Sequence, residues 1–484
     1  MAYVNLAEFL KGLEDVNDVV RISAEVDNDL ELAAIVEHFS KQHDAPPALF
    51  FDNVKSHSIP IFANILGTKQ RMLNALATES FDELGERLMA LIRPDIPQSW
   101  IDSLQLVPRI TELLKLPPKV VKTAICQQVV KIGQDVDLNE IPFPRCWPNE
   151  TNPSIANAQI VICRPNGGAV DAPHIVGQVP LQIIGKDRVA VHWTTRDEEL
   201  GILEQCRKSQ RQVPVAIVLG GDPLLAYAAS VPLPPNTDGW TFAGFLRQAN
   251  VDVILCRTIE ALVPADAEIV IEGMLNPEAD KVEVDGLGLS TGFYGPKEIV
   301  PAIQVTAITQ RSNPMLPVQI PSAPPNERSV WQRATERMTL PLAKLTIPEL
   351  VDIHCPESGA FRNSVFASIQ KTYAGQARKV MNALWGFSWL STMKQIVIVD
   401  EDVNVQDESA VQFQIGANMH PGRDIVFCEG PTDMNDHAAP VRGMGHKMGI
   451  DATRKLAEEG HPRDWPEPLD IPANLADKIE LLLQ

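Results

Sequence analysis

The sequence predicts an α/β protein of three domains, and two observations support this. The chain has 484 residues, which is more than one hydrophobic core usually accommodates. The pattern of expected secondary structure also changes along the chain. Helices alternate with strands over 1–120, short Val- and Ile-rich strands dominate 121–315, and strands and a helix alternate in 331–484. The proline-rich segment 316–330 is expected to be an extended linker.

Each domain follows from its local patterns. In the first domain we expect helices over 6–13, 29–42 and 81–92 and strands over 19–26, 48–54 and 59–65. In the second we expect a helix over 241–248 and strands over 159–163, 179–184, 188–193, 214–219, 251–256, 268–271 and 302–309. Short strands at this spacing are typical of a barrel or closed sheet. In the third domain, strands over 350–354, 365–369 and 395–399 and a helix over 376–393 indicate a βαβ unit.

Composition excludes several classes of function. With 42 basic and 62 acidic residues the net charge is −20, which argues against a general nucleic-acid or anionic-membrane binder. No apolar run is long enough to cross a bilayer, and the N-terminus lacks the pattern of a signal peptide. The 7 cysteines form no Cys-x-x-Cys pair, which is typical of reduced thiols in a cytoplasmic protein.

A glycine-rich stretch near the C-terminus, 439–455, is the first candidate for a binding site. Gly443, Gly445 and Gly449 lie among basic residues, and such a backbone approaches an anion closely. The alternative is a turn that caps a helix and carries solvated charges. Neither Gly-x-Ser-x-Gly nor a dinucleotide-binding Gly-x-Gly-x-x-Gly occurs, so hydrolase and Rossmann sites are not indicated.

Seven stretches, in order along the chain, together resemble the UbiD family of decarboxylases, which use prenylated FMN. They are Asp135 to Leu138 with Pro142 and Pro144, Ile184 to Arg188, Val263 to Gly273, Val305 to Arg311, Lys371 to Gly375, Ile396 to Val403, and Ala439 to Lys455. The resemblance implies an N-terminal α/β domain, a central flavin-reductase-like split β-barrel that holds the cofactor, and a C-terminal α/β oligomerisation domain.

The residues that bind the metal in the family have no counterparts in this sequence when its motifs are aligned. In the family an Asn, a His and a Glu hold a metal that ties the cofactor phosphate to the protein. Aligning on Ile184 to Arg188 and on Trp240 to Gly244 puts Ile175, Arg196 and Gly239 at those positions. Isoleucine and glycine offer no side-chain oxygen or nitrogen to a metal. The resemblance therefore implies no metal site in this chain.

The residues that would position the substrate and deliver a proton are also replaced. The family's Arg, which positions the substrate carboxylate, falls at Pro180. Its two acids fall at Val284 and Leu289 when the chain is aligned on Thr291 and Gly292, and Asp285 is one residue out of register. Only the flavin contacts keep a match, at Ser230, Val231, Pro232 and Lys447. The expected cofactor is therefore none, or a vestigial prenylated FMN.

These losses predict a companion subunit of a multi-subunit aromatic carboxylase or decarboxylase. The resemblance is to phenylphosphate carboxylase, which converts phenyl phosphate and carbon dioxide to 4-hydroxybenzoate, and to its beta subunit. A paralogous UbiD-like partner would then bind prenylated FMN with Mn or Mg and K, in a hetero-oligomer that also holds smaller subunits. No nucleic acid or membrane partner is expected.

Two alternatives stay open. One is a self-sufficient decarboxylase with rearranged ligands, drawn from Asp171, His174, His192 and Asp238. The other is a scaffold or phosphate-binding protein. Three further features favour plain structural roles: Asp400 to Asp402 as a solvated strand end, and Trp331 and the group Trp385, Phe387 and Trp389 as core or interface.

Overall fold

In the computed structural model of the chain, the N-terminal domain is a small sheet covered by helices. The structure describes residues 3–43, 45–92, 116–162, 175–192, 204, 208, 211–234, 237–276, 281–360, 362–467, 469 and 475. The sheet has the order β1-β2-β3-β17, and its strands are β1 (Val19–Ile22), β2 (Ala48–Phe51), β3 (Ile61–Ala63) and β17 (Leu316–Val318). The helices are α1 (Leu6–Asp15), α2 (Glu31–Gln42), α3 (Lys69–Leu76) and α4 (Phe81–Ile92).

The strand β17 comes from the segment that was expected to be a linker. It pairs in parallel with β3, with Leu316 opposite Ile61. The prolines around it are compatible with pairing because β17 is an edge strand, where a missing backbone donor costs little. The chain thus returns to the N-terminal sheet before it continues to the C-terminal domain. This differs from an extended linker over 316–330.

The central domain is a ten-stranded antiparallel sheet that curls into a half-barrel. Its main path is β6-β9-β10-β16-β14-β11-β7-β8, and β5 and β15 also pair with β16. The strands are β5 (Val129–Ile132), β6 (Ser154–Ile155), β7 (Gln159–Ile162), β8 (Ile175–Gln178), β9 (Leu181–Gly185), β10 (Arg188–Val191), β11 (Val213–Leu219), β14 (Ile269–Leu275), β15 (Lys281–Val284) and β16 (Glu298–Gln310). This confirms the predicted split barrel.

A smaller sheet and two helices complete the central domain. The sheet has the order β13-β12-β4, formed by β4 (Lys119–Val120), β12 (Asp252–Leu255) and β13 (Leu262–Pro264). The helices are α7 (Pro223–Ser230) and α8 (Gly239–Arg247). Both begin at an aspartate whose side chain accepts a hydrogen bond from the first turn, Asp222 for α7 and Asp238 for α8.

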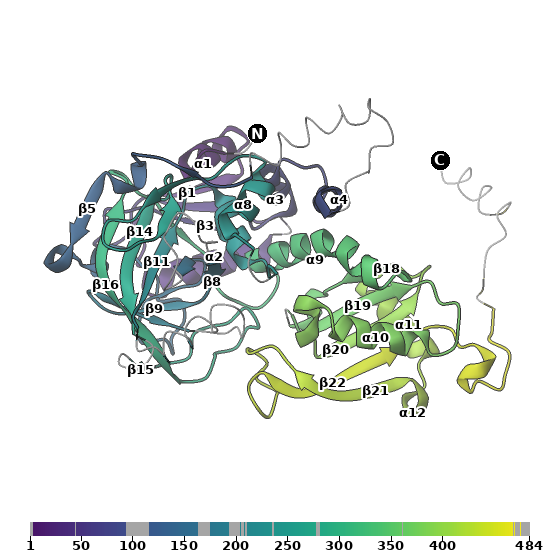
Figure 1. The fold of residues 1–484 in the computed structure, drawn as a ribbon. Helices are drawn as coiled ribbons and strands as arrows, with labels where there is room; N and C mark the ends of the chain where they lie inside the picture. The colour runs from purple at the N-terminus through teal and green to yellow at the C-terminus, as the bar shows by residue number, and fades with distance from the viewer. Residues whose placement is uncertain are drawn as a thin grey trace.

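The C-terminal domain is a five-stranded sheet of order β18-β19-β20-β22-β21, which confirms the predicted α/β class. Its strands are β18 (Leu350–His354), β19 (Ser364–Ile369), β20 (Gln395–Asp400), β21 (Ile425–Pro431) and β22 (Met444–Asp451), and its helices are α10 (Gln376–Trp385), α11 (Glu408–Asn418) and α12 (Pro421–Asp424). The 20-residue helix α9 (Glu327–Thr346) connects this domain to the half-barrel (Figure 1).

Two C-terminal expectations were wrong. The helix expected over 376–393 ends at Trp385, because the Gly386 N–H closes the last turn and Ser388 takes a positive φ of 35° before a short 3-10 helix. The glycine-rich stretch neither caps a helix nor precedes one, because it forms a hairpin turn that leads into β22. A Cβ at Gly449 would lie 2.5 Å from Met381 Sδ, so this glycine is needed for strand-to-helix packing.

The tryptophans and the acidic strand end to which the sequence assigned structural roles lie in the core and at the end of a strand, as expected. Trp331, Trp385 and Trp389 are buried in hydrophobic clusters, with Phe387 packed beside the last two. Asp400 ends β20 and accepts a hydrogen bond from the Arg454 N–H at 2.8 Å. The described cysteines are free thiols, and four of those five are buried. Within the described ranges, no helix is long and apolar enough to span a bilayer.

Candidate functional site

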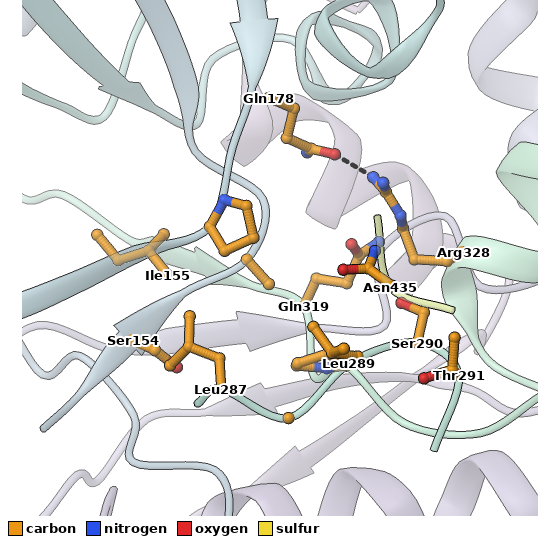
Figure 2. A pocket seen from close by; sticks show the side chains of 14 residues that line it. Ser154, Ile155, Gln178, Leu287, Leu289, Ser290, Thr291, Gln319, Arg328 and Asn435 are labelled. Atoms are coloured by element: carbon orange, nitrogen blue, oxygen red, sulfur yellow. Dashed lines mark hydrogen bonds between the residues drawn. The ribbon is translucent and has the colours of Figure 1, made fainter. Parts of the chain in front are cut away.

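The candidate site is a pocket of about 100 Å³ between the half-barrel, a tight loop and the start of α9. It is lined by Ser154, Ile155, Ala156, Gln178, Pro180, Leu287, Gly288, Leu289, Ser290, Thr291, Gln319, Pro321, Arg328 and Asn435. The lining comes from β6 and β8 of the barrel, the segments that follow β15 and β17, the first turn of α9, and the β21–β22 loop. Figure 2 shows Gln319, Arg328 and Asn435 on one side and Ile155 and Leu287 on the other.

The loop in which the resemblance places Leu289 is a small hairpin. The N–H of Leu289 donates to the Phe293 carbonyl at 3.0 Å, and the N–H of Gly295 donates to the Leu287 carbonyl at 2.8 Å. A Cβ at Gly288 would lie 2.1 Å from Trp147 Cδ1, so the indole can pack here only against a glycine. This packing fixes Leu287 and Leu289 in the pocket wall.

Glu150 anchors this hairpin, and sequence reasoning missed it. Its buried carboxylate accepts hydrogen bonds from the N–H groups of Gly288 at 2.8 Å, Cys146 at 2.9 Å and Trp147 at 3.2 Å. Burial raises the pKa of Glu150, while these donors oppose the rise. With both oxygens held by the backbone, Glu150 organises the loop and is not a pocket-lining acid. The only sequence signal was a charged residue in a proline-rich turn.

The structure brings together some of the predicted family positions. Pro180 and Leu289 both line the pocket, while Ile175 is buried in β8 and Val284 is buried at the end of β15. Asp285, the acid one residue out of register, forms an ion pair with the exposed Lys297 at 2.7 Å, and Lys297 lowers the pKa of Asp285. Asp285 therefore has a partner on the surface side.

The described residues do not fit the metal anchor of the family. Ile175 and Gly239 provide no side-chain ligand atom, and no group of three or more His, Cys, Asp or Glu is placed to hold an ion in the part of the chain that the structure describes. Arg196, Asp171 and His174 lie outside the described residues. A pocket of about 100 Å³ is also far below the roughly 300–1,000 Å³ typical of cofactor sites.

The two described members of the alternative metal set have local roles. His192 is buried, with Nε2 at 3.2 Å from Gln182 Oε1 and Nδ1 at 3.6 Å from Glu298 Oε2. Burial, with Arg442 nearby, lowers the pKa of His192 to about 4. Asp238 caps α8 through the N–H and hydroxyl of Thr241, at 2.7 and 2.9 Å. Neither residue lines the pocket.

The predicted flavin contacts lie away from the pocket lining. Ser230 ends α7 and donates to the Tyr227 carbonyl at 2.7 Å, with Val231 and Pro232 directly after it. Lys447 lies on β22, where its Nζ donates to the Ser391 carbonyl at 2.6 Å and stands 5.4 Å from the Trp385 ring centre. Burial lowers the pKa of Lys447. A cofactor role for these four residues stays a prediction.

The C-terminal domain contacts the pocket loop through the segment between β21 and β22. The rings of Phe293 and His437 lie 4.2 Å apart, and Arg442 forms an ion pair with Glu298 at the start of β16. Asn435, from the same segment, lines the pocket. The β21–β22 loop thus closes one side of the site.

Comparison with known proteins agrees with this architecture. Models of the 3-octaprenyl-4-hydroxybenzoate carboxy-lyase family match with their N-terminal domain over residues 10–88, their Rift-related domain over 119–324 and their C-terminal domain over 329–452. An uncharacterised protein of Aquifex aeolicus is 36% identical over 478 residues, covering 99% of this chain and 97% of that protein.

Two solved structures are similar over nearly the whole chain. Vanillic acid decarboxylase of Sedimentibacter hydroxybenzoicus in its closed form has a TM-score of 0.85 with 26% identity, covering 100% of both chains. HmfF of Pelotomaculum thermopropionicum in complex with FMN has a TM-score of 0.80 with 24% identity, covering 99% of both chains. The half-barrel between two α/β domains is thus the architecture of a class of carboxy-lyases. The chain belongs to the UbiD family.

Proposed function

We propose that this chain is a UbiD-family subunit without a decarboxylation centre of its own, which works beside a paralogous catalytic chain in an aromatic carboxylase or decarboxylase. One observation carries the proposal: among the residues that the structure describes, the pocket beside Pro180 and Leu289 is lined by one charged side chain, that of Arg328, and by no carboxylate or imidazole. Protonation of a carbon centre needs a positioned acid within hydrogen-bond reach. The described lining offers none.

The substitutions at the family positions point the same way. Pro180 and Leu289 replace an arginine and an acid with side chains that neither donate nor accept a proton, and both face the pocket. Val284, at the other acid position, is buried in apolar surroundings with Ala190 and Val300. A site with rearranged metal ligands draws no support from His192 or Asp238, because each is committed to a local contact.

The assembly we propose is of the phenylphosphate carboxylase kind, in which this chain would take the role of the beta subunit. The conversion would be the reversible carboxylation of an activated phenol, carried out on the partner chain with its prenylated FMN. The vanillic acid decarboxylase that resembles this chain has also been solved with a truncated VdcD component, so that relative contains a second kind of chain. A cytoplasmic location and smaller additional subunits belong to the same proposal.

Expression of the full chain together with a prenyl-FMN-forming enzyme tests the proposal. We expect the purified chain to release no carbon dioxide from 4-hydroxybenzoate. We also expect it to restore activity when it is mixed with a UbiD-like paralogue, encoded in the same genome, that has the Arg and both acids. Release of carbon dioxide by the chain alone would contradict the proposal, and so would full activity of that paralogue without it.

A further inference from the structure

Lys447, on β22, is a buried lysine that forms no ion pair with a carboxylate among the described residues. The residue is 3% exposed, and its Nζ donates a hydrogen bond to the Ser391 carbonyl at 2.6 Å. An ammonium group has three donors, so this contact leaves most of its charge uncompensated. Burial of a charge without a partner of opposite sign favours the neutral form of the group.

Two other buried lysines of the same domain each have a carboxylate partner. Lys455 is 6% exposed, and its Nζ lies 3.0 Å from Asp451 Oδ1. The side chain of Lys371 is 4% exposed and forms an ion pair with Glu459. A neighbouring carboxylate favours the ammonium form, because opposite charges attract. Lys447 lacks this support, so its amine loses a proton more readily than the amines of Lys371 and Lys455.

The groups that face Lys447 Nζ do little to hold its proton. Burial lowers the pKa of Lys447, and the thiol of Cys428, directly opposite on β21, acts in the other direction. The Trp385 ring of α10, with its centre 5.4 Å away, attracts the ammonium form weakly. Glu429 and His446, a neighbouring cross-strand pair, are exposed on the opposite face of the sheet. The fraction of neutral, nucleophilic amine is therefore larger than for an exposed lysine at the same pH.

Open space lies beside this amine. Among the described residues, a Cβ built on Gly430 of β21 would have only Lys447 Cε, at 3.6 Å, and Nζ, at 3.7 Å, within 4 Å. A group of at least methyl size therefore fits there in contact with Nζ. A Cβ on Gly449, further along β22, would instead lie 2.5 Å from Met381 Sδ. Because β21 is the edge strand and Gly430 is partly exposed, a small molecule can reach this space from solvent.

We propose that the Lys447 amine reacts reversibly with carbon dioxide to form a carbamate. The nitrogen lone pair attacks the carbon, an N–C bond forms, and the electron pair of one C=O bond moves to its oxygen. The nitrogen then releases a proton to water, so that the neutral amine and carbon dioxide give a carbamate anion and a proton. The reaction needs no oxidant or further reactant. The planar carboxylate would occupy the space beside Gly430 and face solvent at the sheet edge.

Carbamate formation reverses the charge at this position from positive to negative. Lys447 lies on the hairpin of β21 and β22, and the loop of that hairpin lines the pocket through Asn435. The reaction thus places a charge that depends on carbon dioxide in the element that closes one side of the pocket. The inference rests on Lys447 and its surroundings, and it does not depend on the proposed subunit role.

NMR of the full chain with carbon-13-labelled bicarbonate and carbon dioxide, at about pH 7.5, tests the proposal while ordinary lysines remain protonated. We expect a carbamate signal that grows with carbon dioxide and saturates. Alkylation with a trialkyloxonium reagent converts the carbamate to a stable ester, and peptide mass spectrometry should find that ester on the peptide that contains Lys447. The absence of a carbamate signal, or an ester confined to other amines, would overturn the proposal without the use of any variant.

Two variants and a control locate the reaction. Lys447→Met should remove the signal, apart from any contribution of the N-terminal amine. Gly430→Ala keeps the lysine and fills the space beside it, so it should lower the carbamate fraction at least about fivefold. Its added Cβ would be at ordinary contact distance, so the fold should be kept. Lys344→Gln removes an exposed lysine of α9 and should leave the signal unchanged. An unchanged signal in Lys447→Met or Gly430→Ala, or an equal loss in Lys344→Gln, would overturn the proposal.

Discussion

Arg328 in α9 and Gln178 in β8 lie 150 residues apart in the chain and meet across the pocket through a hydrogen bond from the guanidinium to the amide oxygen. This contact connects the half-barrel to the helix that leads into the C-terminal domain. It also leaves a half-buried positive charge without an ion pair to a carboxylate among the described residues. Ligand sites commonly keep such unfavourable groups at the expense of stability.

Arg328→Met should raise the stability of the ligand-free chain by about 1–2 kcal/mol, because it replaces an uncompensated charge with an apolar side chain of similar length. Arg71→Met is the matched comparison, since Arg71 is buried and paired with Asp18. It should lower the stability by about 3–5 kcal/mol. Urea midpoints of the two variants check this. A loss of stability in Arg328→Met similar to that in Arg71→Met would show that Arg328 is a structural residue.

Stability should depend on His192 at mildly acidic pH. Its native pKa of about 4 lies below the ordinary value of 6.5, so the unfolded chain binds the proton more readily. The contribution of neutral His192 is therefore fully present above about pH 6.5 and is lost as the pH falls toward 4. The loss is on the order of 3 kcal/mol.

His192→Gln isolates this effect from the titration of carboxylates over the same range. The variant cannot take up a proton at this position, so its urea midpoint should fall less than that of the unmodified chain between pH 6.5 and 4.5. The Glu150 carboxylate works in the opposite direction, because its negative charge raises the pKa of His192. Parallel pH profiles for the two proteins would mean that this carboxylate cancels the effect of burial.

Gly288→Ala should destabilise the hairpin that lines the pocket. The added Cβ would lie 2.1 Å from Trp147 Cδ1, so the indole or the hairpin must move, at a cost of about 1–3 kcal/mol. Gly295→Ala is the control in the same loop, because the nearest atom to its Cβ would be at 3.6 Å. We expect the urea midpoint to fall in the first variant and to stay close to that of the unmodified chain in the second. Equal urea midpoints of the two variants would refute the packing argument.

Arg442→Gln should loosen the contact between the C-terminal domain and the pocket loop. It removes the ion pair with Glu298 and leaves that carboxylate without its cationic partner. Hydrogen exchange should then become faster in residues 285–297 and 432–443. Arg454→Gln, which breaks an exposed pair with Asp402 elsewhere in the same domain, should leave these segments unchanged. Protection that does not change in Arg442→Gln would mean that the ring contact of Phe293 with His437 holds the loop alone.

The sequence predicted much of the domain architecture, because the patterns that indicate helices and strands are local in the chain. The series of short strands over 121–315 predicted the barrel. The resemblance placed Pro180 and Leu289 at site positions, and both line the pocket. Arg328 escaped notice because it was assigned to a linker, where an arginine normally faces solvent. Its burial depends on β17 joining the N-terminal sheet and on α9 starting at Glu327, and both are long-range events.

The C-terminal glycines were misread for a related reason. A run with three glycines and basic residues suggests an anion-binding turn, yet Gly445 and Gly449 lie inside β22. Their need for glycine comes from neighbours brought close by folding, such as Met381 at Gly449. No local pattern distinguishes a glycine required by packing from one required by a ligand.

One measurement tests the central claim most directly, which is that the chain has no decarboxylation centre of its own. The full chain, co-expressed with the prenyl-FMN-forming enzyme, is mixed with 4-hydroxybenzoate labelled with carbon-13 at the carboxyl group and followed by NMR. We predict that the carboxyl signal keeps its full intensity and that no labelled carbon dioxide or bicarbonate appears. Appearance of labelled carbon dioxide or bicarbonate would contradict the account.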